Sequence, residues 1–478
     1  MSAYLAVDLG AETGRVMRGE LVDGRLTVAE VHRFANVPVR REDGLHWDTT
    51  ALFAGVSAGI TAAGAHGPLS SIGIDTWGND FGLLDRAGRL VAEPWHHRDP
   101  RTRAAVASVT DRVGAAELYR ITGTPPLSIT TASQLVAMEG SPLLAAADRL
   151  AMLPDLFGYW LTGHLVTEQT IASTSQLLDV TTRRWATGVM DRLGIPTRLF
   201  AGEVVAPGTP TGPVRKLPGV VVTAVAGHDT ASAVAALPVE SDAFAYVASG
   251  TWSLAGLELP GPVLTEAARL AGFSNEAGVG GTVRFLRNGT GLWLLQRCRA
   301  AWAGSSYAEL VDAAATVPAF GALVDPDHPD FLAPPDMPAQ LAARCRETGQ
   351  PAPAGRAALV RCVLDSLACK HRWTIERAEA LSGRTPSAVV HVVGGGAANS
   401  LLCQLVADVT GRQVLAGPVE ATAIGNLLVQ AWAAGAVSCL PEVRQVVRRS
   451  VEVRRYAPGP GAERAAAAYT RFLALLDV

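Results

Sequence analysis

The sequence predicts an α/β protein whose two halves share one plan and face one another across a ligand-binding cleft. Both halves begin with an apolar strand, a polar turn that contains glycine, and a return strand, at residues 4–21 and 243–257. The chain has 478 residues, and single hydrophobic cores stop growing at roughly 250–300 residues. We therefore expect two domains, at residues 1–238 and 239–478, with a ligand held between them.

The first half opens with a β-meander. Its three strand-like runs are residues 4–8, 15–21 and 26–34. Asp23 and Gly24 join the last two runs and are typical of a hairpin turn. The other elements expected in this half are a helix at residues 49–65 and strands at residues 71–76 and 80–84.

The second half repeats this order with longer helices. Its expected elements are strands at residues 243–248 and 252–257, a helix at 357–381, a strand at 388–393 and a helix that begins near Asn399. Three glycines at residues 394–396 separate the last strand from the last helix.

The composition excludes several classes of protein. The net charge is −3 and lysine and arginine form no cluster, so we expect no nucleic-acid partner. The longest apolar stretch, residues 427–440, contains Gln430 and is too short to span a bilayer. The first strand begins almost at once and leaves no room for a signal peptide, so we expect a cytoplasmic protein without a membrane partner.

The six cysteines all lie in the second half, and none forms a C-x-x-C pair. We interpret them as buried free thiols of a cytoplasmic protein. Cys362 and Cys369 lie two turns apart on one face of an expected helix and could approach one another.

The turn at residues 8–15 is typical of a hairpin that grips phosphate. Gly10 and Gly14 let the backbone take left-handed angles, so successive N–H groups can converge on an anion. Asp8 at the strand end can hold a metal ion through water, and a threonine and an arginine add a hydroxyl and a guanidinium. Because many glycine-rich hairpins are only turns, this function depends on the rest of the chain.

The lysines exclude one way of binding a nucleotide. Only Lys216 and Lys370 occur, and neither follows a G-x-x-x-x-G run, which rules out a Walker-type phosphate loop. Backbone amides, hydroxyls and arginines must then hold any nucleotide.

Asp229 is the candidate catalytic residue. An apolar strand at residues 220–226 runs through Gly227 into a helix, which sets Asp229 at the helix N-terminus. The helix dipole keeps a carboxylate ionised there, able to accept a proton from a substrate hydroxyl. The alternative is that Asp229 is an ordinary N-cap of the helix, without a catalytic role. Together with the phosphate-type turns, this carboxylate favours phosphoryl transfer, which needs mostly positioning and charge neutralisation.

Six motifs, in order and spacing, resemble the FGGY family of carbohydrate kinases from end to end, and within it the branch that acts on L-rhamnulose. They are residues 8–15, 73–78, 228–234, 249–254, Asn288 with 291–297, and 393–396 with 416–421. The resemblance implies the duplicated actin/Hsp70/hexokinase-type (ribonuclease H-like) two-lobe fold with its active site in the interlobe cleft. It also implies ATP and Mg²⁺ as cofactors and phosphorylation of the 1-hydroxyl of L-rhamnulose in L-rhamnose catabolism.

The resemblance implies a role for individual residues. Asp229 is the implied proton acceptor, and Asp8 holds the metal through water. The implied sugar contacts are Gly78, His228, Asp229, Thr230 and Asn288. The implied ATP contacts are Ala11, Glu12, Thr13, Gly14, Arg15, Thr251, Gln296 and Gly395. The glycines at 394–396 would then let the nucleotide approach the backbone closely. Their spacing does not match that of a dinucleotide-binding domain.

Two positions depart from the family pattern, because serine is common where Glu12 and Gly227 stand here. The carboxylate of Glu12 would repel phosphates unless it faces solvent or Mg²⁺.

Two alternatives stay open at this point. One is a kinase of the same family for another sugar, such as L-fuculose, L-ribulose or D-xylulose, with residues 77–80 as the place where specificity is set. The other is a non-kinase ATPase of the chaperone or actin type, which would not need an aspartate aimed at a hydroxyl. The sequence leaves the oligomeric state open.

Overall fold

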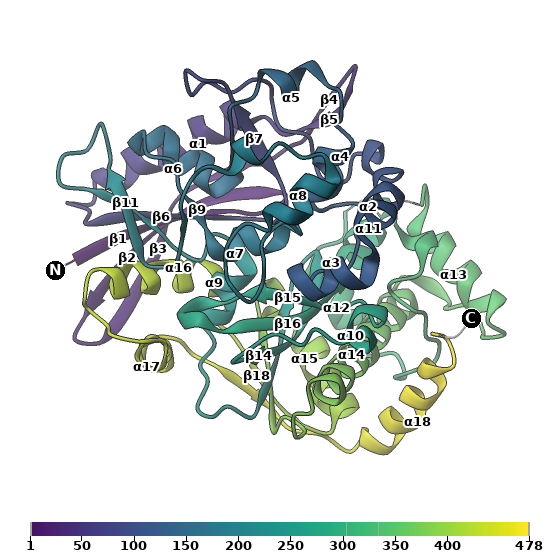
Figure 1. The fold of residues 1–478 in the computed structure, drawn as a ribbon. Coiled ribbons are helices and arrows are strands. Elements are labelled where there is room, and N and C mark those ends of the chain that lie inside the picture. The colour runs from purple at the N-terminus through teal and green to yellow at the C-terminus, as the bar shows by residue number, and fades with distance from the viewer. Residues whose placement is uncertain (1, 303, 333, 477–478) are drawn as a thin grey trace. The chain divides into compact units, whose positions relative to one another are not determined.

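The computed structural model describes residues 2–302, 304–332 and 334–476 (Figure 1). These residues form two compact units. Unit 1 comprises Met1–Pro238, Glu258–Phe285 and Ala421–Ser450, and unit 2 comprises Val239–Leu257, Leu286–Glu420 and Val451–Val478. Unit 1 therefore includes two segments from the second half of the chain.

Unit 1 is built on a six-stranded sheet in the order β11-β12-β6-β1-β2-β3. The strands are β1 (Ser2–Leu9), β2 (Thr13–Val22), β3 (Arg25–Ala35), β6 (Ser71–Thr76), β11 (Thr209–Pro213) and β12 (Val221–Ala224). β1, β2 and β3 pair antiparallel in succession, which confirms the predicted meander. β1, β6 and β12 pair parallel, and β11 closes the edge antiparallel to β12.

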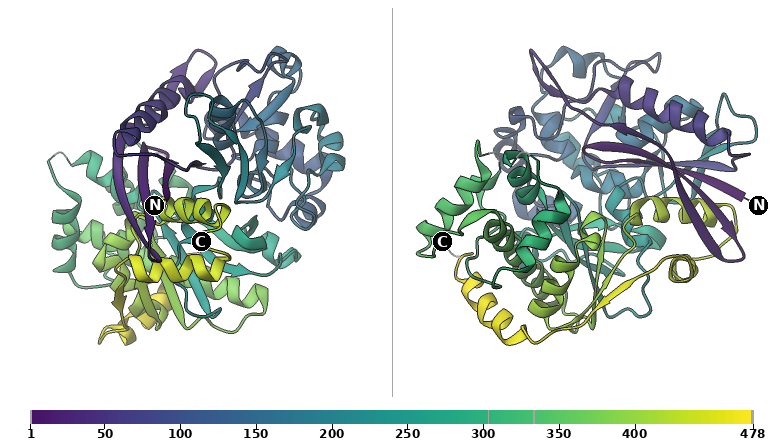
Figure 2. Two further views of the ribbon diagram at one scale, coloured as in Figure 1. Left: turned by 90° about the vertical axis from the view of Figure 1, so that its left-hand side faces the viewer. Right: turned by 180° about the vertical axis from the view of Figure 1, so that it is seen from behind.

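The two faces of this sheet carry different layers. Leu5, Val7 and Leu9 of β1 pack in one hydrophobic core with residues of α1 (Thr49–Gly64) and α6 (Leu153–Thr162). Because strand side chains alternate between faces, Asp8 lies on the other face. That face is covered by α16 (Ala421–Ala433), which contacts β1 and β6. The right-hand view of Figure 2 shows α1 and α16 on opposite sides of the purple strands.

The close packing of α16 explains two glycines in the sheet. A Cβ atom at Gly19 would lie 2.6 Å from Leu427, and one at Gly73 would lie 2.3 Å from Asn426. Gln430 fixes the helix further, since its amide donates to the Leu5 carbonyl at 3.0 Å and its oxygen accepts from a buried serine hydroxyl of β6 at 2.6 Å. A side chain at either glycine would push α16 off the sheet.

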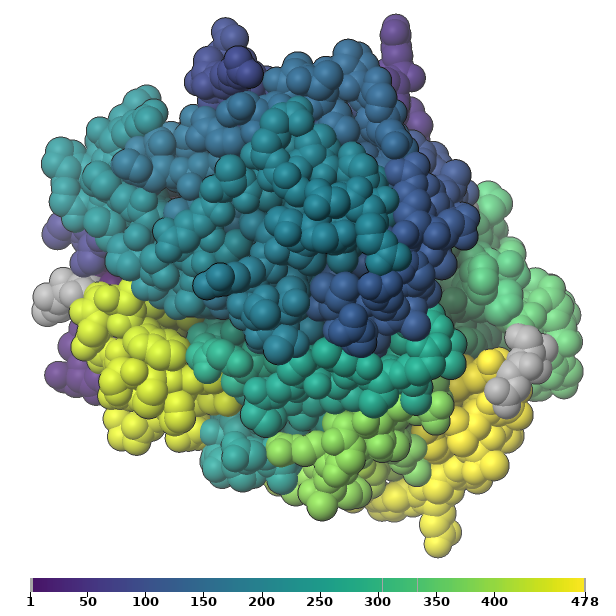
Figure 3. All heavy atoms as spheres, in the orientation of Figure 1, coloured from purple at the N-terminus to yellow at the C-terminus, as the bar shows by residue number. Residues whose placement is uncertain are grey.

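A second layer of unit 1 surrounds the antiparallel pair β7 (Phe81–Leu84) and β8 (Arg149–Met152). Its helices are α2 (Ala105–Val113), α3 (Ala115–Thr122), α4 (Thr131–Val136), α5 (Pro142–Ala146) and α8 (Thr187–Leu193). All five contribute residues to a separate apolar core. The space-filling view shows this blue part of unit 1 as closely packed atoms (Figure 3).

The remaining elements of unit 1 are short, except for α17. They are β4 (Val39–Arg41), β5 (Gly44–His46), β9 (Thr167–Glu168), α7 (Gln169–Ala172), β10 (Val204–Val205), α9 (Asp229–Ala235), α10 (Glu266–Leu270), β15 (Ser274–Ala277) and α17 (Leu440–Ser450). Six 3₁₀ turns, η1 to η6, occur along the described chain.

Unit 2 repeats the plan of unit 1. The second large sheet of the described chain has seven strands in the order β15-β16-β14-β13-β17-β18-β19, of which β15, the end of β14 and the start of β16 belong to unit 1. Its further strands are β13 (Phe244–Ser249), β14 (Trp252–Leu259), β16 (Val283–Thr290), β17 (Val389–Val393), β18 (Gln413–Ala416) and β19 (Arg454–Tyr456). β13 pairs antiparallel with β14 and parallel with β17, β18 continues parallel, and β19 is antiparallel. The corresponding pairings of unit 1 are the same, so the predicted duplication is confirmed.

The described residues of unit 2 form six helices. They are α11 (Trp293–Ala301), α12 (Tyr307–Ala315), α13 (Met337–Glu347), α14 (Gly355–Ser382), α15 (Ser400–Thr410) and α18 (Ala462–Leu473). Across the part of the chain that the structure describes, no helix combines the length and the apolar character needed to cross a membrane.

The expectation that Cys362 could approach Cys369 is wrong. Both lie on α14 seven residues apart, which separates them by about 10 Å along a helix, too far for a disulfide. The thiol that contacts Cys362 is instead that of Cys345 on α13. All six cysteines are free.

Candidate functional site

The turn between β1 and β2 is held by a hydrogen bond of its own and by one from the residue that follows β3. The Gly10 N–H donates to the Thr13 carbonyl at 2.9 Å, and the amide of Asn36 donates to the Gly10 carbonyl at 2.8 Å. The expectation of left-handed angles at Gly10 and Gly14 is wrong, because neither has a positive φ. Space requires glycine at position 14 instead, where a Cβ would lie 2.3 Å from the Phe34 ring; at Gly10 a Cβ would make a tight contact, 3.3 Å from the Thr13 carbonyl oxygen.

Glu12 points out of this turn and is exposed. Its charge acts on the half-buried Arg98: burial lowers the pKa of that guanidinium, and the Glu12 carboxylate opposes the shift. A positive group therefore offsets part of the charge that would repel a phosphate.

Asp8 and Asp75 sit side by side where β1 and β6 run parallel. The Asp8 carboxylate forms an ion pair with Arg15 at 2.5 Å. Asp75 is fully buried and accepts from the Asn426 amide of α16 at 2.6 Å, while its Oδ1 has no hydrogen-bond partner. Burial, reinforced by the negative charge of Asp8, raises the pKa of the Asp75 carboxyl well above its usual range.

Asp229 is the first residue of α9, as the sequence predicts, and His228 occupies the N-cap position without a capping side-chain bond. The Asp229 carboxylate accepts from the Thr230 N–H at 2.6 Å and from the Thr230 hydroxyl at 3.1 Å. Its side chain keeps 30% of its surface exposed. It is therefore an anchored carboxylate at a helix N-terminus that a ligand can still reach.

The residue before this pair is a glycine because the space is filled. A Cβ at Gly227 would lie 3.1 Å from the Glu168 carboxylate and 3.2 Å from Pro154. The Gly227 N–H donates to that carboxylate at 2.9 Å, and the Gly227 carbonyl accepts from Thr76 N–H at 2.9 Å. These bonds tie the start of α9 to β6.

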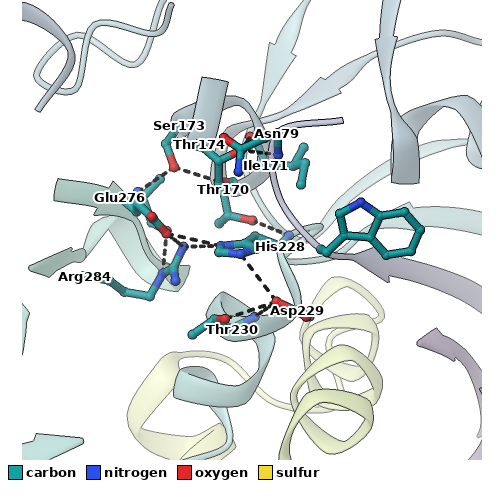
Figure 4. Close-up of polar contacts among 12 residues, drawn as sticks. Asn79, Thr170, Ile171, Ser173, Thr174, His228, Asp229, Thr230, Glu276 and Arg284 are labelled. Carbon is teal, nitrogen blue, oxygen red and sulfur yellow. Dashed lines mark hydrogen bonds and ion pairs between the residues drawn. The ribbon is translucent and has the colours of Figure 1, made fainter. Parts of the chain in front are cut away.

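His228 lies between Asp229 and a buried ion pair (Figure 4). Its Nε2 is 3.4 Å from an Asp229 carboxylate oxygen, and its Nδ1 is 2.9 Å from an Arg284 nitrogen and 3.2 Å from a Glu276 oxygen. Burial alone would raise the pKa of Glu276, but the charges around it, chiefly the Arg284 guanidinium, outweigh it and hold that pKa at about 2.

Glu276 should therefore make unit 1 sensitive to acid. A carboxyl whose pKa falls from 4.5 to about 2 on folding adds stability above pH 4.5, on the order of 3 kcal/mol, and loses it as the pH drops toward 2. We expect Glu276→Gln to remove this part of the pH dependence in urea unfolding between pH 2 and 6. The exposed Glu42→Gln serves as control, and parallel curves for wild type and Glu276→Gln would contradict the assignment.

The segment after β6 forms a buried polar cluster around Asp80. Its carboxylate accepts from the indoles of Trp47 at 2.6 Å and Trp77 at 2.8 Å, from His97 Nδ1 at 2.8 Å and from the Gln134 amide at 2.9 Å. Burial alone would raise the pKa of Asp80, but the charge and hydrogen bond of His97 leave it below its usual value.

This cluster fixes the loop that carries Gly78. Asn79 has a φ of 75°, and its N–H donates to the Thr174 hydroxyl at 3.0 Å. A Cβ at Gly78 would lie 3.1 Å from the Thr174 methyl carbon, so a larger residue there would disturb the loop. Gly78, His228, Asp229 and Thr230 all belong to unit 1.

A second candidate region lies in unit 2 at the turn between β13 and β14. This turn is bonded to the start of α11, since the Leu292 N–H donates to the Gly250 carbonyl at 2.8 Å and the Trp293 N–H to the Thr251 carbonyl at 3.1 Å. The Gln296 amide donates to the Thr251 hydroxyl at 3.2 Å. Two predicted nucleotide contacts are thus brought together.

The glycines after β17 pack against the same turn. Gly394 has a φ of 77°, and a Cβ at Gly396 would lie 2.1 Å from the Ser249 hydroxyl. At Gly395, by contrast, a Cβ would meet no atom within 4 Å. A hollow of about 160 Å³ lies next to the residues that follow these glycines; its lining is Ala397, Ala398, Ala416, Gly417, Val419, Glu452 and Arg454.

Other residues of the site carried no role in the sequence prediction. Asp75 lies inside one of the motifs, but its burial depends on α16, which is distant in the sequence. No local sequence pattern marks Glu168, Glu276 or Arg284. Asn288 is exposed on the part of β16 that belongs to unit 2, so its role at the sugar stays a prediction. Among the described residues, no group of three or more histidine, cysteine, aspartate or glutamate side chains is arranged to hold a metal ion.

Solved structures share the fold of this chain. Ligand-bound xylulose kinase from Lactobacillus acidophilus superposes with a TM-score of 0.81 over 100% of this chain and 97% of that one, at 16% identity. Plasmodium falciparum glycerol kinase with ADP gives 0.78 over 99% and 98%, at 14% identity. The predicted two-domain α/β fold is confirmed.

Sequence relatives are closer. Rhamnulokinase of Bacteroides thetaiotaomicron is 41% identical to this chain, and the alignment covers 95% of this chain and 96% of the relative. Rhamnulokinase of Bacillus subtilis is 37% identical, and the alignment covers 95% of both chains. Residues 3–234 match the N-terminal domain of the FGGY family of carbohydrate kinases, and residues 245–434 match its C-terminal domain. With both domains matched, this chain belongs to the FGGY family of carbohydrate kinases.

Proposed function

We propose that the chain transfers the γ-phosphoryl group of ATP to the 1-hydroxyl of L-rhamnulose, in L-rhamnose catabolism. The sugar oxygen attacks the γ-phosphorus, the bond to the β–γ bridging oxygen breaks, and ADP leaves while Asp229 takes the hydroxyl proton. The observation that carries the proposal is the anchored, reachable Asp229 carboxylate in a chain 41% identical to a rhamnulokinase. The free cysteines fit a reducing compartment, so we expect the reaction in the cytoplasm.

The sugar would be bound by unit 1. The hydroxyl that reacts lies at Asp229, and the backbone at Gly78 and the side chains of His228 and Thr230 hold the rest of the molecule. Because Asp80 fixes the loop at residues 77–80, this loop is the part that would discriminate one ketose from another.

ATP would be bound by the turns described above. Residues 11–15 of the first turn offer backbone N–H groups and the Arg15 guanidinium to the phosphates, as phosphoryl transfer requires. In unit 2, Thr251, Gln296 and Gly395 would contact the nucleotide, the first two being joined by a hydrogen bond at 3.2 Å.

Gly395 provides a test of the nucleotide site. Gly395→Ala should raise the KM for ATP about tenfold, because the added methyl group intrudes where the nucleotide approaches while meeting no protein atom. Thermal stability and the KM for the sugar should stay unchanged. Gly321→Ala, another glycine with free space around it, is the matched control. An unchanged KM for ATP would place the nucleotide elsewhere.

The residues around Asp8 fit a divalent cation. Two carboxylates stand side by side there, and one buried oxygen of Asp75 has no hydrogen-bond partner. Mg²⁺ favours such oxygen ligands and keeps several waters, so Asp8, through water, and Asp75 would hold it. When bound, Mg²⁺ neutralises charge on the phosphates.

The test is an ADP-release assay over a panel of ketoses, aldoses and polyols, with the phosphorylated position identified by ³¹P–¹H correlation. L-Rhamnulose should give the highest kcat/KM and a 1-phosphate product. A higher kcat/KM for L-fuculose, L-ribulose or D-xylulose would identify that sugar as the substrate in place of L-rhamnulose. ADP release that no sugar stimulates would indicate a non-kinase ATPase.

A further inference from the structure

Arg284 is the most completely buried charged side chain near Asp229, with 0% of its surface exposed. It lies in the part of β16 that belongs to unit 1. One guanidinium nitrogen lies 2.9 Å from His228 Nδ1 and 2.8 Å from a Glu276 carboxylate oxygen, and its Nε donates to the Ala277 carbonyl at 3.1 Å. Figure 4 shows the guanidinium and the carboxylate together on one side of the imidazole.

The contact with Arg284 dictates which nitrogen of His228 carries the proton. A guanidinium has only N–H donors and stays charged in proteins, so it can bond to Nδ1 only through a lone pair on that nitrogen. Nδ1 must then be unprotonated, and the ring proton of the neutral imidazole sits on Nε2. Nε2 is the nitrogen that faces the Asp229 carboxylate at 3.4 Å.

Glu276 alone would favour the opposite arrangement. Its carboxylate lies 3.2 Å from Nδ1 and would accept a hydrogen bond from a protonated nitrogen there, but the Arg284 nitrogen lies closer to Nδ1, at 2.9 Å, and pairs with the same carboxylate oxygen at 2.8 Å. Its ion pair with Arg284 instead balances a charge that has no contact with water. The other charged groups around the ring are Asp229 on α9 and Glu168 on β9, whose carboxylate accepts from the Thr170 hydroxyl at 2.6 Å.

The backbone of His228 is held independently of its ring. Its N–H donates to the Thr170 hydroxyl at 3.1 Å, and the preceding Gly227 N–H bonds to Glu168. These backbone bonds fix the position of His228. Arg284 is not needed to place the residue, and it selects the tautomer of the ring.

We propose that Arg284, neutralised by Glu276, is a positioning residue that keeps His228 in its neutral Nε2–H tautomer, so that His228 donates a hydrogen bond beside the catalytic carboxylate. The Nε2–H donor orients a sugar oxygen at Asp229 and leaves Asp229 as the proton acceptor. An imidazole with its lone pair on Nε2 would instead compete for the proton of the sugar hydroxyl.

The tautomer is measured directly by ring ¹⁵N chemical shifts in protein labelled with ¹⁵N-histidine, with His228→Gln identifying the signals of His228. We expect an unprotonated Nδ1 and a protonated Nε2 at neutral pH. A proton on Nδ1, or on both nitrogens, would overturn the proposal. This measurement uses the wild-type protein and does not depend on the sugar substrate.

The kinetic test rests on the proposed function and uses variants that keep the buried charges matched. The double variant Arg284→Met with Glu276→Gln should lower kcat/KM for the sugar about 10- to 100-fold, the loss expected for a hydrogen bond to a charged group. The KM for ATP should stay unchanged, whereas a merely structural defect would affect both substrates. In the same variant the ring signals should show loss of the single tautomer.

Two further variants complete the test. Arg284→Lys keeps the charge and a donor near Nδ1, so it should recover most of the sugar kcat/KM. The exposed pair Arg112 and Glu139, joined at 2.6 Å, gives the control double variant Arg112→Met with Glu139→Gln. Unchanged sugar kinetics in the folded Arg284 double variant, or an Arg284→Lys protein no better than it, would contradict the proposal.

Discussion

Replacement of Asp229 by asparagine is expected to lower kcat by about 10²- to 10⁴-fold, the range that a general base contributes. An amide cannot take the proton of the sugar hydroxyl. Its oxygen can still accept from the Thr230 N–H, which bonds to Asp229 at 2.6 Å, so the start of α9 keeps its geometry. Thermal unfolding and nucleotide affinity should therefore match wild type, and the loss should appear in kcat rather than in the KM for ATP.

Asp111→Asn is the matched control, because Asp111 is an exposed carboxylate on α2 of the same unit. Turnover near the wild-type level in Asp229→Asn would remove Asp229 from the mechanism and leave it with the role of an ordinary helix-terminal carboxylate.

Removal of the Asp80 carboxylate should give the largest loss of stability in unit 1. Asp80→Ala leaves the indole N–H groups of Trp47 and Trp77, the ring of His97 and the amide of Gln134 without their shared acceptor. Breaking a buried charged cluster from one side costs about 3–5 kcal/mol. Urea unfolding followed by tryptophan fluorescence measures this difference at neutral pH.

The pH dependence of the same variant supplies a second check. Folding lowers the pKa of Asp80. Its contribution to the free energy of unfolding is therefore complete above the pKa of the carboxyl in the unfolded chain, and it is lost as the pH falls through the lower pKa of the folded state. The gap between wild type and Asp80→Ala should therefore narrow under acid conditions. A gap of less than about 1 kcal/mol at neutral pH, the size of an ordinary hydrogen bond, would mean that the cluster is less cooperative than its geometry implies.

Local sequence patterns predicted the elements that surround the site. The strand at residues 71–76 and the start of α9 at Asp229 lie where the pattern indicates, because each has a strong signal of its own: a buried apolar run, or a glycine followed by a polar helix start. The glycines of the first turn were assigned correctly to a hairpin but for the wrong reason. Gly14 is needed because of the Phe34 ring, which only the folded chain brings near.

Contacts between segments that are distant in the sequence could not be predicted from local patterns. Asn426 bonds to Asp75 across 351 residues, and Arg284 reaches His228 across 56. No periodicity or short motif encodes such pairs, since each partner alone is an unremarkable polar residue in an apolar element. The Cys362 interpretation was wrong for the same reason: its neighbour comes from another helix, α13, and not from its own.

The docking of α16 on β1 and β6 has a consequence for synthesis on the ribosome. Strand β1 leaves the exit tunnel long before α16, the helix that covers its Asp8-bearing face, because α16 begins more than 400 residues after β1 ends. Until then the nascent chain exposes Gly19, Gly73 and the flanking strand surface, which makes it a natural client for holding chaperones. A fragment that stops before residue 421 should accordingly be recovered aggregated or chaperone-bound.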